Sequence, residues 1–68
     1  MTKIRLKDDY IKLGQALKFA NVVESGVDAK IVILDGLVSV NGEVCLQRGK
    51  KLVSGDVVTF EEETIYIE

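Results

Sequence analysis

The apolar positions in the first third of the chain recur at helical spacing. At steps of three and four residues they share one helical face: Leu13, Ala16, Leu17 and Ala20. Polar side chains fall on the opposite face: Lys12, Gln15 and Lys18. We therefore predict an amphipathic helix that begins at Lys12 and ends near Asn21, a residue type that suits the end of a helix.

A second helix is predicted over residues 26–35. Ser25 can cap it, because its hydroxyl accepts hydrogen bonds from the first free backbone amides, and Asp28 suits the positive end of the helix. Gly36 is expected to end the helix in a left-handed conformation. The helix is apolar almost all round, so we expect it to be mostly buried. Its apolar residues are Val27, Ala29, Ile31, Val32, Ile33 and Leu34.

Alternation with period two, together with turn residues, indicates short strands around the helices: residues 3–6, 38–40, 43–45, 57–60 and 64–67. Asn41-Gly42 predicts a type I′ hairpin turn, because both residues accept a positive φ. The run of glutamates at 61–63 is expected to be the solvated turn of a second hairpin. Tyr10-Ile11 can close the first strand or pack against the first helix, and the pattern leaves both open.

These elements predict an α+β fold in which two short helices pack on a small antiparallel sheet. The inward faces predict a shared core: Leu13, Leu17, Ile31, Leu34, Val38, Val40 and Phe60. Between the sheet strands, residues 47–51 indicate a polar, basic loop. Leu52 and Val53 are expected to return to the core before a turn at residues 54–56.

Length and composition limit the classes of function that the chain can have. A chain of 68 residues is expected to form one domain, residues 1–68. It has no His and one Cys, so the usual general base is missing and a structural zinc site cannot be built. Its glycines are spread over separate turns instead of forming one phosphate-cradling loop. We therefore expect a protein that is not an enzyme and that carries no metal and no cofactor.

The single cysteine and the lack of long apolar runs bear on location. Cys45 has no partner for an intramolecular disulfide, which favours a reducing compartment, the cytoplasm. No signal peptide is visible, and no apolar run approaches the roughly 18 residues that span a membrane. We expect no membrane partner, and we expect a monomer.

Charge is distributed unevenly along the chain. Residues 1–56 carry nine Lys and Arg against seven Asp and Glu, whereas residues 57–68 carry four Glu and no cation. The formal net charge of −2 therefore hides a basic part of the molecule. Cations that lie together attract phosphates. The candidate RNA-binding residues are Lys12, Lys18, Lys30, Arg48, Lys50 and Lys51.

Four runs of residues, in this order, resemble the RNA-binding domain of the ribosomal protein S-four type. They are 12–17 (Lys-Leu-Gly-Gln-Ala-Leu), 25–29 (Ser-Gly-Val-Asp-Ala), 36–42 (Gly-Leu-Val-Ser-Val-Asn-Gly) and 53–57 (Val-Ser-Gly-Asp-Val). The resemblance covers residues 12–60. Residues 48–52, Arg-Gly-Lys-Lys-Leu, also resemble a segment of small stand-alone bacterial members, in which this domain is the whole protein.

The resemblance implies an alpha-L motif, two helices backed by a β-hairpin, that docks on structured RNA. Ribosomal RNA or a ribosome-associated RNA is implied by analogy. Family members contact RNA phosphates with basic side chains of these helices and the neighbouring loop. Lys12 stands where the family often has Arg, Lys30 follows the matched Ala29, and the cations of residues 48–51 match the loop.

The chain also departs from the family pattern. Gly14 stands where Asp is usual, and Gly26 stands where Arg is often found. With fewer cations and a net acidic chain, we expect RNA binding of modest affinity. Because the deep, narrow groove of duplex RNA prevents side chains from reading base edges there, such a module is expected to recognise shape and phosphate placement.

Two alternatives belong to other classes. The chain can be a protein-interaction module whose acidic C-terminal hairpin docks on a basic partner. Residues 40–43 and 55–58 also resemble small β-grasp sulfur carriers, but those need a C-terminal Gly-Gly and this sequence ends Ile67-Glu68. Replacement of the cations at 48, 50 and 51 distinguishes RNA binding from the interaction module.

Overall fold

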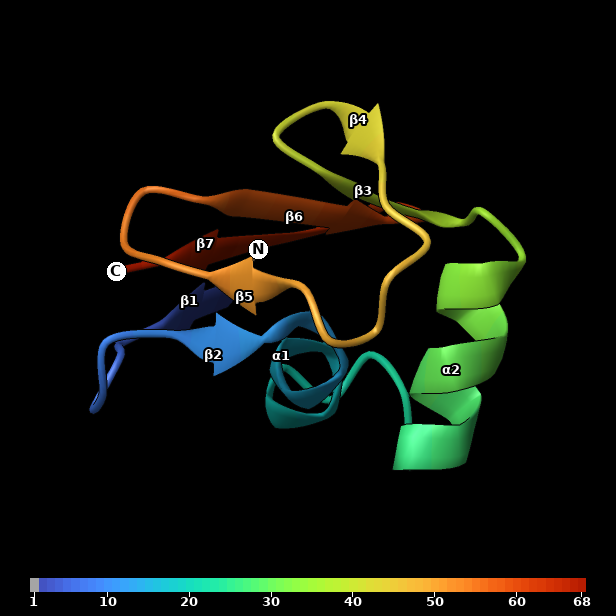
Figure 1. The fold of residues 1–68 in the computed structure, drawn as a ribbon, viewed down its shortest axis with the longest axis horizontal. Helices are drawn as coiled ribbons and strands as arrows, with labels where there is room; N and C mark the ends of the chain where they lie inside the picture. Colours follow the sequence, from blue (N-terminus) through green and yellow to red (C-terminus); the bar gives the residue numbers. More distant parts are fainter. Residues whose placement is uncertain (1) are drawn as a thin grey trace.

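The computed structural model describes residues 2–68 and shows a small α+β fold of two helices and a mixed sheet (Figure 1). In chain order the elements are β1 (Thr2–Ile4), β2 (Ile11–Lys12), α1 (Leu13–Phe19), α2 (Gly26–Leu34), β3 (Val38–Val40), β4 (Glu43–Val44), β5 (Lys51–Leu52), β6 (Val57–Phe60) and β7 (Glu63–Ile67). The predicted fold class is confirmed.

The main sheet has the strand order β1-β7-β6-β3-β4. Every pairing in it is antiparallel except that of β1 with β7, which is parallel. The prediction of a purely antiparallel sheet is therefore wrong at this edge, and the first strand spans Thr2–Ile4 instead of residues 3–6. The parallel edge joins the two ends of the chain, a non-local pairing that no local alternation encodes.

A second, two-stranded sheet contains Ile11, one of the two residues whose role the sequence pattern left open. Ile11 and Lys12 form β2 and pair antiparallel with Leu52 and Lys51 of β5. Residues 47–51 were predicted to be loop throughout, but Lys51 begins this strand. The pairing places β2 directly before α1 and brings the basic loop of residues 47–50 to the start of that helix.

Both predicted hairpins are present. Asn41 and Gly42 have φ values of 52° and 87°, as a type I′ turn requires, and Val40 pairs with Glu43 across the turn. Phe60 pairs with Glu63 at the end of the second hairpin. The second hairpin is therefore confirmed, but its turn comprises only Glu61 and Glu62, because Glu63, which was predicted to lie in the turn, begins β7.

The helix boundaries follow the predicted signals closely. The α1 helix is shorter than predicted, because it ends at Phe19, and Asn21 lies beyond it with a φ of 64°. Ser25 caps α2 by accepting a hydrogen bond from the Asp28 backbone N–H at 3.2 Å. Gly36 follows α2 with a φ of 78°, the left-handed conformation expected there.

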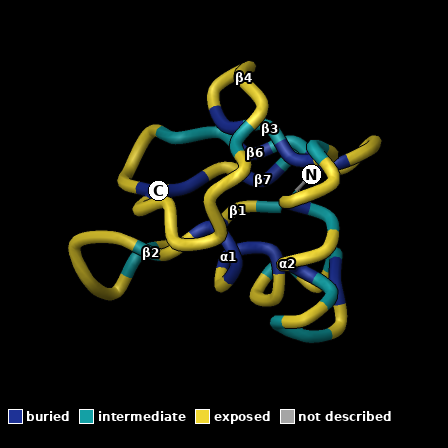
Figure 2. The backbone as a smooth tube through the Cα atoms, turned by 45° about the vertical axis from the view of Figure 1, so that its right-hand side comes forward, coloured by how far each residue is buried: buried dark blue, intermediate teal, exposed yellow. Residues whose placement is uncertain are grey.

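The core lies between the helices and the main sheet, where buried segments of both meet (Figure 2). Five of the seven predicted core residues are buried: Leu13, Leu17, Val38, Val40 and Phe60. The other two are wrong, because Ile31 and Leu34 remain 52% and 58% exposed. Val53 is also exposed, because it stands at the turn before β6.

The prediction that α2 is mostly buried is wrong as well. Only Ala29 and Ile33 of this helix are buried, while Val27 is 68% exposed. The α2 helix lies at the edge of the molecule, so one side meets α1 and the rest faces solvent (Figure 1). No helix within residues 2–68 is long and apolar enough to cross a membrane.

Candidate functional site

The loop of residues 47–50 is anchored to the start of α1 by backbone hydrogen bonds. The Leu13 N–H donates to the Lys50 carbonyl at 2.8 Å, and the Gly14 N–H donates to the Arg48 carbonyl at 3.0 Å. These are N–H groups that the first turn of a helix leaves without an internal partner. The loop carbonyls therefore provide hydrogen-bond acceptors for the first turn of the helix, and these bonds fix the position of the loop.

Arg48 lies close against α1 because residue 14 is glycine. A Cβ atom at Gly14 would stand 2.7 Å from the Cγ of Arg48, closer than side-chain carbons approach one another. Gly14 is itself buried in the first turn of α1. The glycine that departs from the family pattern thus makes room for a cation of the neighbouring loop.

Three predicted cations meet at one surface depression of about 300 Å³, which we call the basic hollow. Its lining residues come from the end of β2, α1, the first turn of α2 and the loop before β5: Lys12, Gly14, Gln15, Lys18, Gly26, Arg48 and Gly49. None of these residues is acidic. Of the three glycines in the wall, Gly26 and Gly49 leave open space where a Cβ atom would stand, so an anionic group can approach the three cations.

Lys51 lies next to this hollow. It pairs directly with Lys12 across β2 and β5, so the two side chains leave the small sheet on the same face. Like charges directly opposite one another are unfavourable in a sheet. The Lys51 ammonium lies 4.8 Å from the ring centroid of Tyr10, which partly offsets this repulsion by a cation–π contact.

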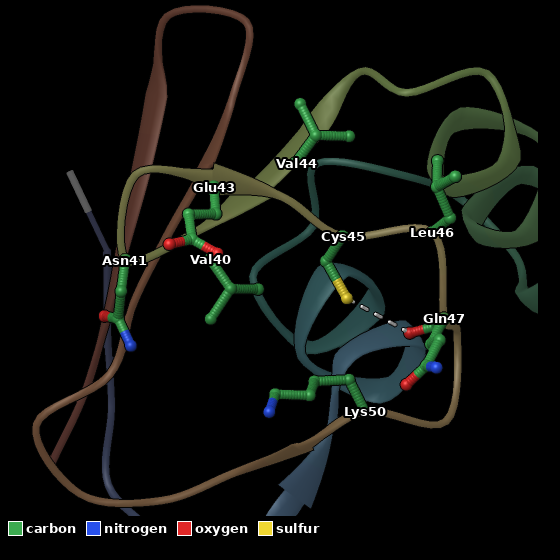
Figure 3. A pocket seen from close by; sticks show the side chains of 8 residues that line it. All are labelled: Val40, Asn41, Glu43, Val44, Cys45, Leu46, Gln47 and Lys50. Atoms are coloured by element: carbon green, nitrogen blue, oxygen red, sulfur yellow. Dashed lines mark hydrogen bonds between the residues drawn. The ribbon is translucent and has the colours of Figure 1, made fainter.

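The two remaining predicted cations are placed differently. Lys30 is exposed on α2 and follows Gly26 by four residues, so it stands one turn along the same helical face. Lys50 lines another depression, between β4 and the loop of residues 45–50 (Figure 3). The structure therefore gathers Lys12, Lys18 and Arg48, sets Lys51 beside them, and directs Lys50 elsewhere.

The depression that contains Lys50 has mixed chemistry. Glu43 and Lys50 carry opposite charges there, and Val44 and Leu46 add apolar surface (Figure 3). Cys45 is half-buried, and its thiol donates to the Gln47 carbonyl at 3.7 Å. Because a carboxylate shares the space with the cation, this depression is less suited to phosphate than the basic hollow.

The Asn41 and Asp56 side chains, which belong to the sequence runs of the resemblance, hold two turns together. The Asn41 amide donates to Asp56 at 3.0 Å and accepts from the Val57 N–H at 2.9 Å. Asp56 also accepts from the Val53 N–H at 2.8 Å. The hydrogen bonds from Asn41 and Val53, with the charge of Lys50, lower the pKa of Asp56. These motif residues are therefore structural.

Sequence reasoning missed residues beside the basic hollow. Tyr10 and Phe19 are exposed and line a neighbouring depression. The exposure of Phe19 could have been predicted, because this residue lies off the apolar face of α1 that the core residues define. Within residues 2–68, no group of three His, Cys, Asp or Glu side chains is placed to hold a metal ion.

Comparison with known proteins gives consistent matches. The family model of the S4 domain matches residues 4–68. A protein named probable ribosome maturation protein RlbA, from Bacillus subtilis, is 45% identical over 58 residues, which cover 85% of this chain and 82% of that protein. A protein named putative RNA-binding protein YbcJ, from Escherichia coli, is 34% identical over 61 residues, which cover 90% of this chain and 87% of that protein.

Proposed function

This chain belongs to the S4 domain family, and we propose that it is a non-enzymatic protein that binds structured RNA by holding phosphates at the basic hollow. The observation that carries the proposal is the meeting of Lys12, Lys18 and Arg48 at one depression without a carboxylate. In a chain of net charge −2, three cations at one depression that no carboxylate lines are an uneven distribution of charge, although Lys12 also lines a neighbouring depression with Asp8 and Asp9.

Rigid placement supports phosphate binding at this site. Arg48 stands in a loop that two backbone hydrogen bonds fix to α1, and Lys12 ends a paired strand. Preorganised cations lose less conformational entropy on binding than free lysines do. Phosphate contacts position a protein on RNA without reading sequence, so the proposed recognition is of RNA shape.

We further propose that the RNA is ribosomal or ribosome-associated. The support is the name of the Bacillus subtilis relative, a probable ribosome maturation protein, together with the family. Lys30 and Lys51 are proposed to extend the phosphate-binding face to either side of the basic hollow. Lys50 is expected to contribute less, because it lines the mixed depression.

The test is the salt dependence of binding to a labelled hairpin RNA. With about three to five phosphates neutralised, log affinity should fall with log salt with a slope of roughly −2 to −5. Replacing Lys12, Lys18 and Arg48 together by Gln should flatten that slope by about 2 to 3. Circular dichroism should show an unchanged fold, because all three side chains are exposed.

Lys3→Gln provides the control for net charge. Lys3 lies in β1, outside the basic hollow, so it should change affinity far less than Arg48→Gln, although both variants lose one positive charge. Equal effects of the two single variants would show that binding follows net charge and not this site. Absence of RNA binding at low salt would instead favour the protein-interaction module.

A further inference from the structure

Two exposed aromatic side chains lie beside the basic hollow. Tyr10 is 40% exposed and Phe19 is 66% exposed, and both line a depression of about 300 Å³ that we call the aromatic hollow. Ile4, Leu6 and Ile11 supply further apolar lining. Large apolar surface left open to water is more informative than a single exposed aliphatic residue, because it marks a site for a ligand or partner.

The two hollows adjoin at α1. Gln15 lines both of them, and Phe19 follows it by one helical turn. Lys12 and Tyr10 meet at a third depression, of about 390 Å³, that Gln15, Asp8 and Asp9 also line. Lys51, which belongs to β5, also reaches this region, because its ammonium lies over the Tyr10 ring. A ligand whose charged part occupied the basic hollow would therefore place its neighbouring group against the aromatic rings.

We propose, resting on the proposed function, that the aromatic hollow accepts one unpaired base of the bound RNA while the phosphates beside that base lie at the basic hollow. Unpaired bases stack on aromatic side chains, and every base has a flat face for this contact. The protein should therefore prefer an RNA helix interrupted by a bulged nucleotide or a loop nucleotide, since a fully paired helix keeps its bases stacked inside.

Charges around the aromatic hollow orient such a nucleotide. Asp8 is among the lining residues and repels phosphate, but its carboxylate can accept a hydrogen bond from an amino group of a base. Arg5 and Lys7 stand at the same hollow and attract the next phosphate of the strand. The base is therefore expected in the hollow, with its neighbouring phosphates at Lys7 and Lys12 and not at Asp8.

The experiment compares two hairpin RNAs that differ only in one bulged 2-aminopurine nucleotide in the stem. The protein should bind the bulged RNA about tenfold more tightly than the fully paired RNA, because stacking adds to the phosphate contacts. Binding should also quench the 2-aminopurine fluorescence as the base enters the aromatic hollow. Phe19→Leu should remove most of the preference and the quenching, whereas Phe19→Tyr, which keeps a ring, should retain them.

Leu34→Ala is the matched control, because Leu34 is 58% exposed on α2 and lines neither hollow. It should leave the preference unchanged. If the parent binds both RNAs equally, with the salt slope intact and no quenching, the base pocket is refuted and phosphate binding stands. If the parent binds neither RNA, both proposals are refuted.

Discussion

The substitution Gly26→Arg should raise the affinity of the protein for RNA. Gly26 lines the basic hollow at the first position of α2, and a Cβ atom built there meets nothing within 4 Å. A longer side chain therefore fits without moving its neighbours. An arginine there would place a fourth cation at a depression that already holds Lys12, Lys18 and Arg48.

The effect of Gly26→Arg can be worked out from counterion release. One additional phosphate contact steepens the slope of log affinity against log salt by about 0.7 to 0.9. Over a tenfold rise in salt, the advantage of the variant over the parent should therefore shrink by roughly five- to eightfold. At physiological salt an exposed ion pair stabilises by about 0.2–1 kcal/mol, which corresponds to roughly a 1.4- to 5-fold gain in affinity.

Stability should hardly change in this variant. Replacing glycine in a helix by arginine gains up to about 1 kcal/mol of helix propensity, and less than that at the first position. A cation at the positive end of the helix costs about 0.3–1 kcal/mol. The two effects oppose each other, so the melting temperature should stay within a few degrees of that of the parent.

The assay is fluorescence anisotropy with a labelled hairpin RNA over a series of salt concentrations. Gly26→Gln is the matched control, because it changes the backbone in the same way and adds a side chain without charge. If both variants bind with the parent's affinity and slope while the parent binds RNA, Gly26 does not face the phosphates. The basic hollow would then not be the RNA-binding site.

Three further predictions concern the fold. Leu17→Ala should cost roughly 2–5 kcal/mol of unfolding free energy in urea melts, because Leu17 is fully buried, whereas Ile31→Ala should cost less than about 1 kcal/mol at a half-exposed site. Gly42→Val should cost about 1–2 kcal/mol or more, because Gly42 has a positive φ that a β-branched residue resists, and its thermal melt should show this. Because hydrogen bonds from Asn41 and the Val53 N–H lower the folded pKa of Asp56, its carboxylate should stabilise the fold above the unfolded pKa of about 3.9, and this contribution should be lost as pH falls through the folded value. Asp56→Asn should therefore lower stability at pH 7, and the gap to the parent should narrow at pH 3.

The parts of the fold that the sequence predicted are encoded locally. Ser25 caps α2, and Asn41-Gly42 forms the tight turn, because each depends on residues only a few positions away. The parallel pairing of β1 with β7 and the short pairing of β2 with β5 join distant segments. Neither leaves a periodic pattern in so few residues, so sequence reasoning could not find them.

Burial of α2 was predicted wrongly for a related reason. An apolar helix in a larger protein is surrounded by other elements, but here α2 stands at the edge and has neighbours on one side only (Figure 1). The sequence shows that Val27 and Ile31 are apolar, but it does not show how many elements are available to cover them. In a chain of 68 residues the supply of covering elements is small.

In the candidate site, too, the residues placed by local sequence were predictable and the contacts between distant segments were not. Lys12 and Lys18 were predictable from helical spacing, since both fall on the polar face of the predicted helix, although in the structure Lys12 ends β2 and directly precedes α1. That Arg48 joins them and Lys50 does not depends on two backbone hydrogen bonds between the loop and α1, and on the missing side chain at Gly14. The charge run at residues 48–51 indicated cations near one another but could not show in which direction each one points.

Net charge is a poor guide to what this molecule attracts. The chain carries a net charge of −2, yet its longest dimension is 27 Å and the Debye length at physiological ionic strength is about 8 Å. Solvent-exposed charges more than a Debye length from the basic hollow are largely screened, so a phosphate there experiences mainly the charges close to it, among which are Lys12, Lys18 and Arg48. In a protein this small, the local arrangement of Lys12 at the end of β2, Lys18 on α1 and Arg48 on the anchored loop is therefore a better basis for predicting phosphate binding than the net charge is.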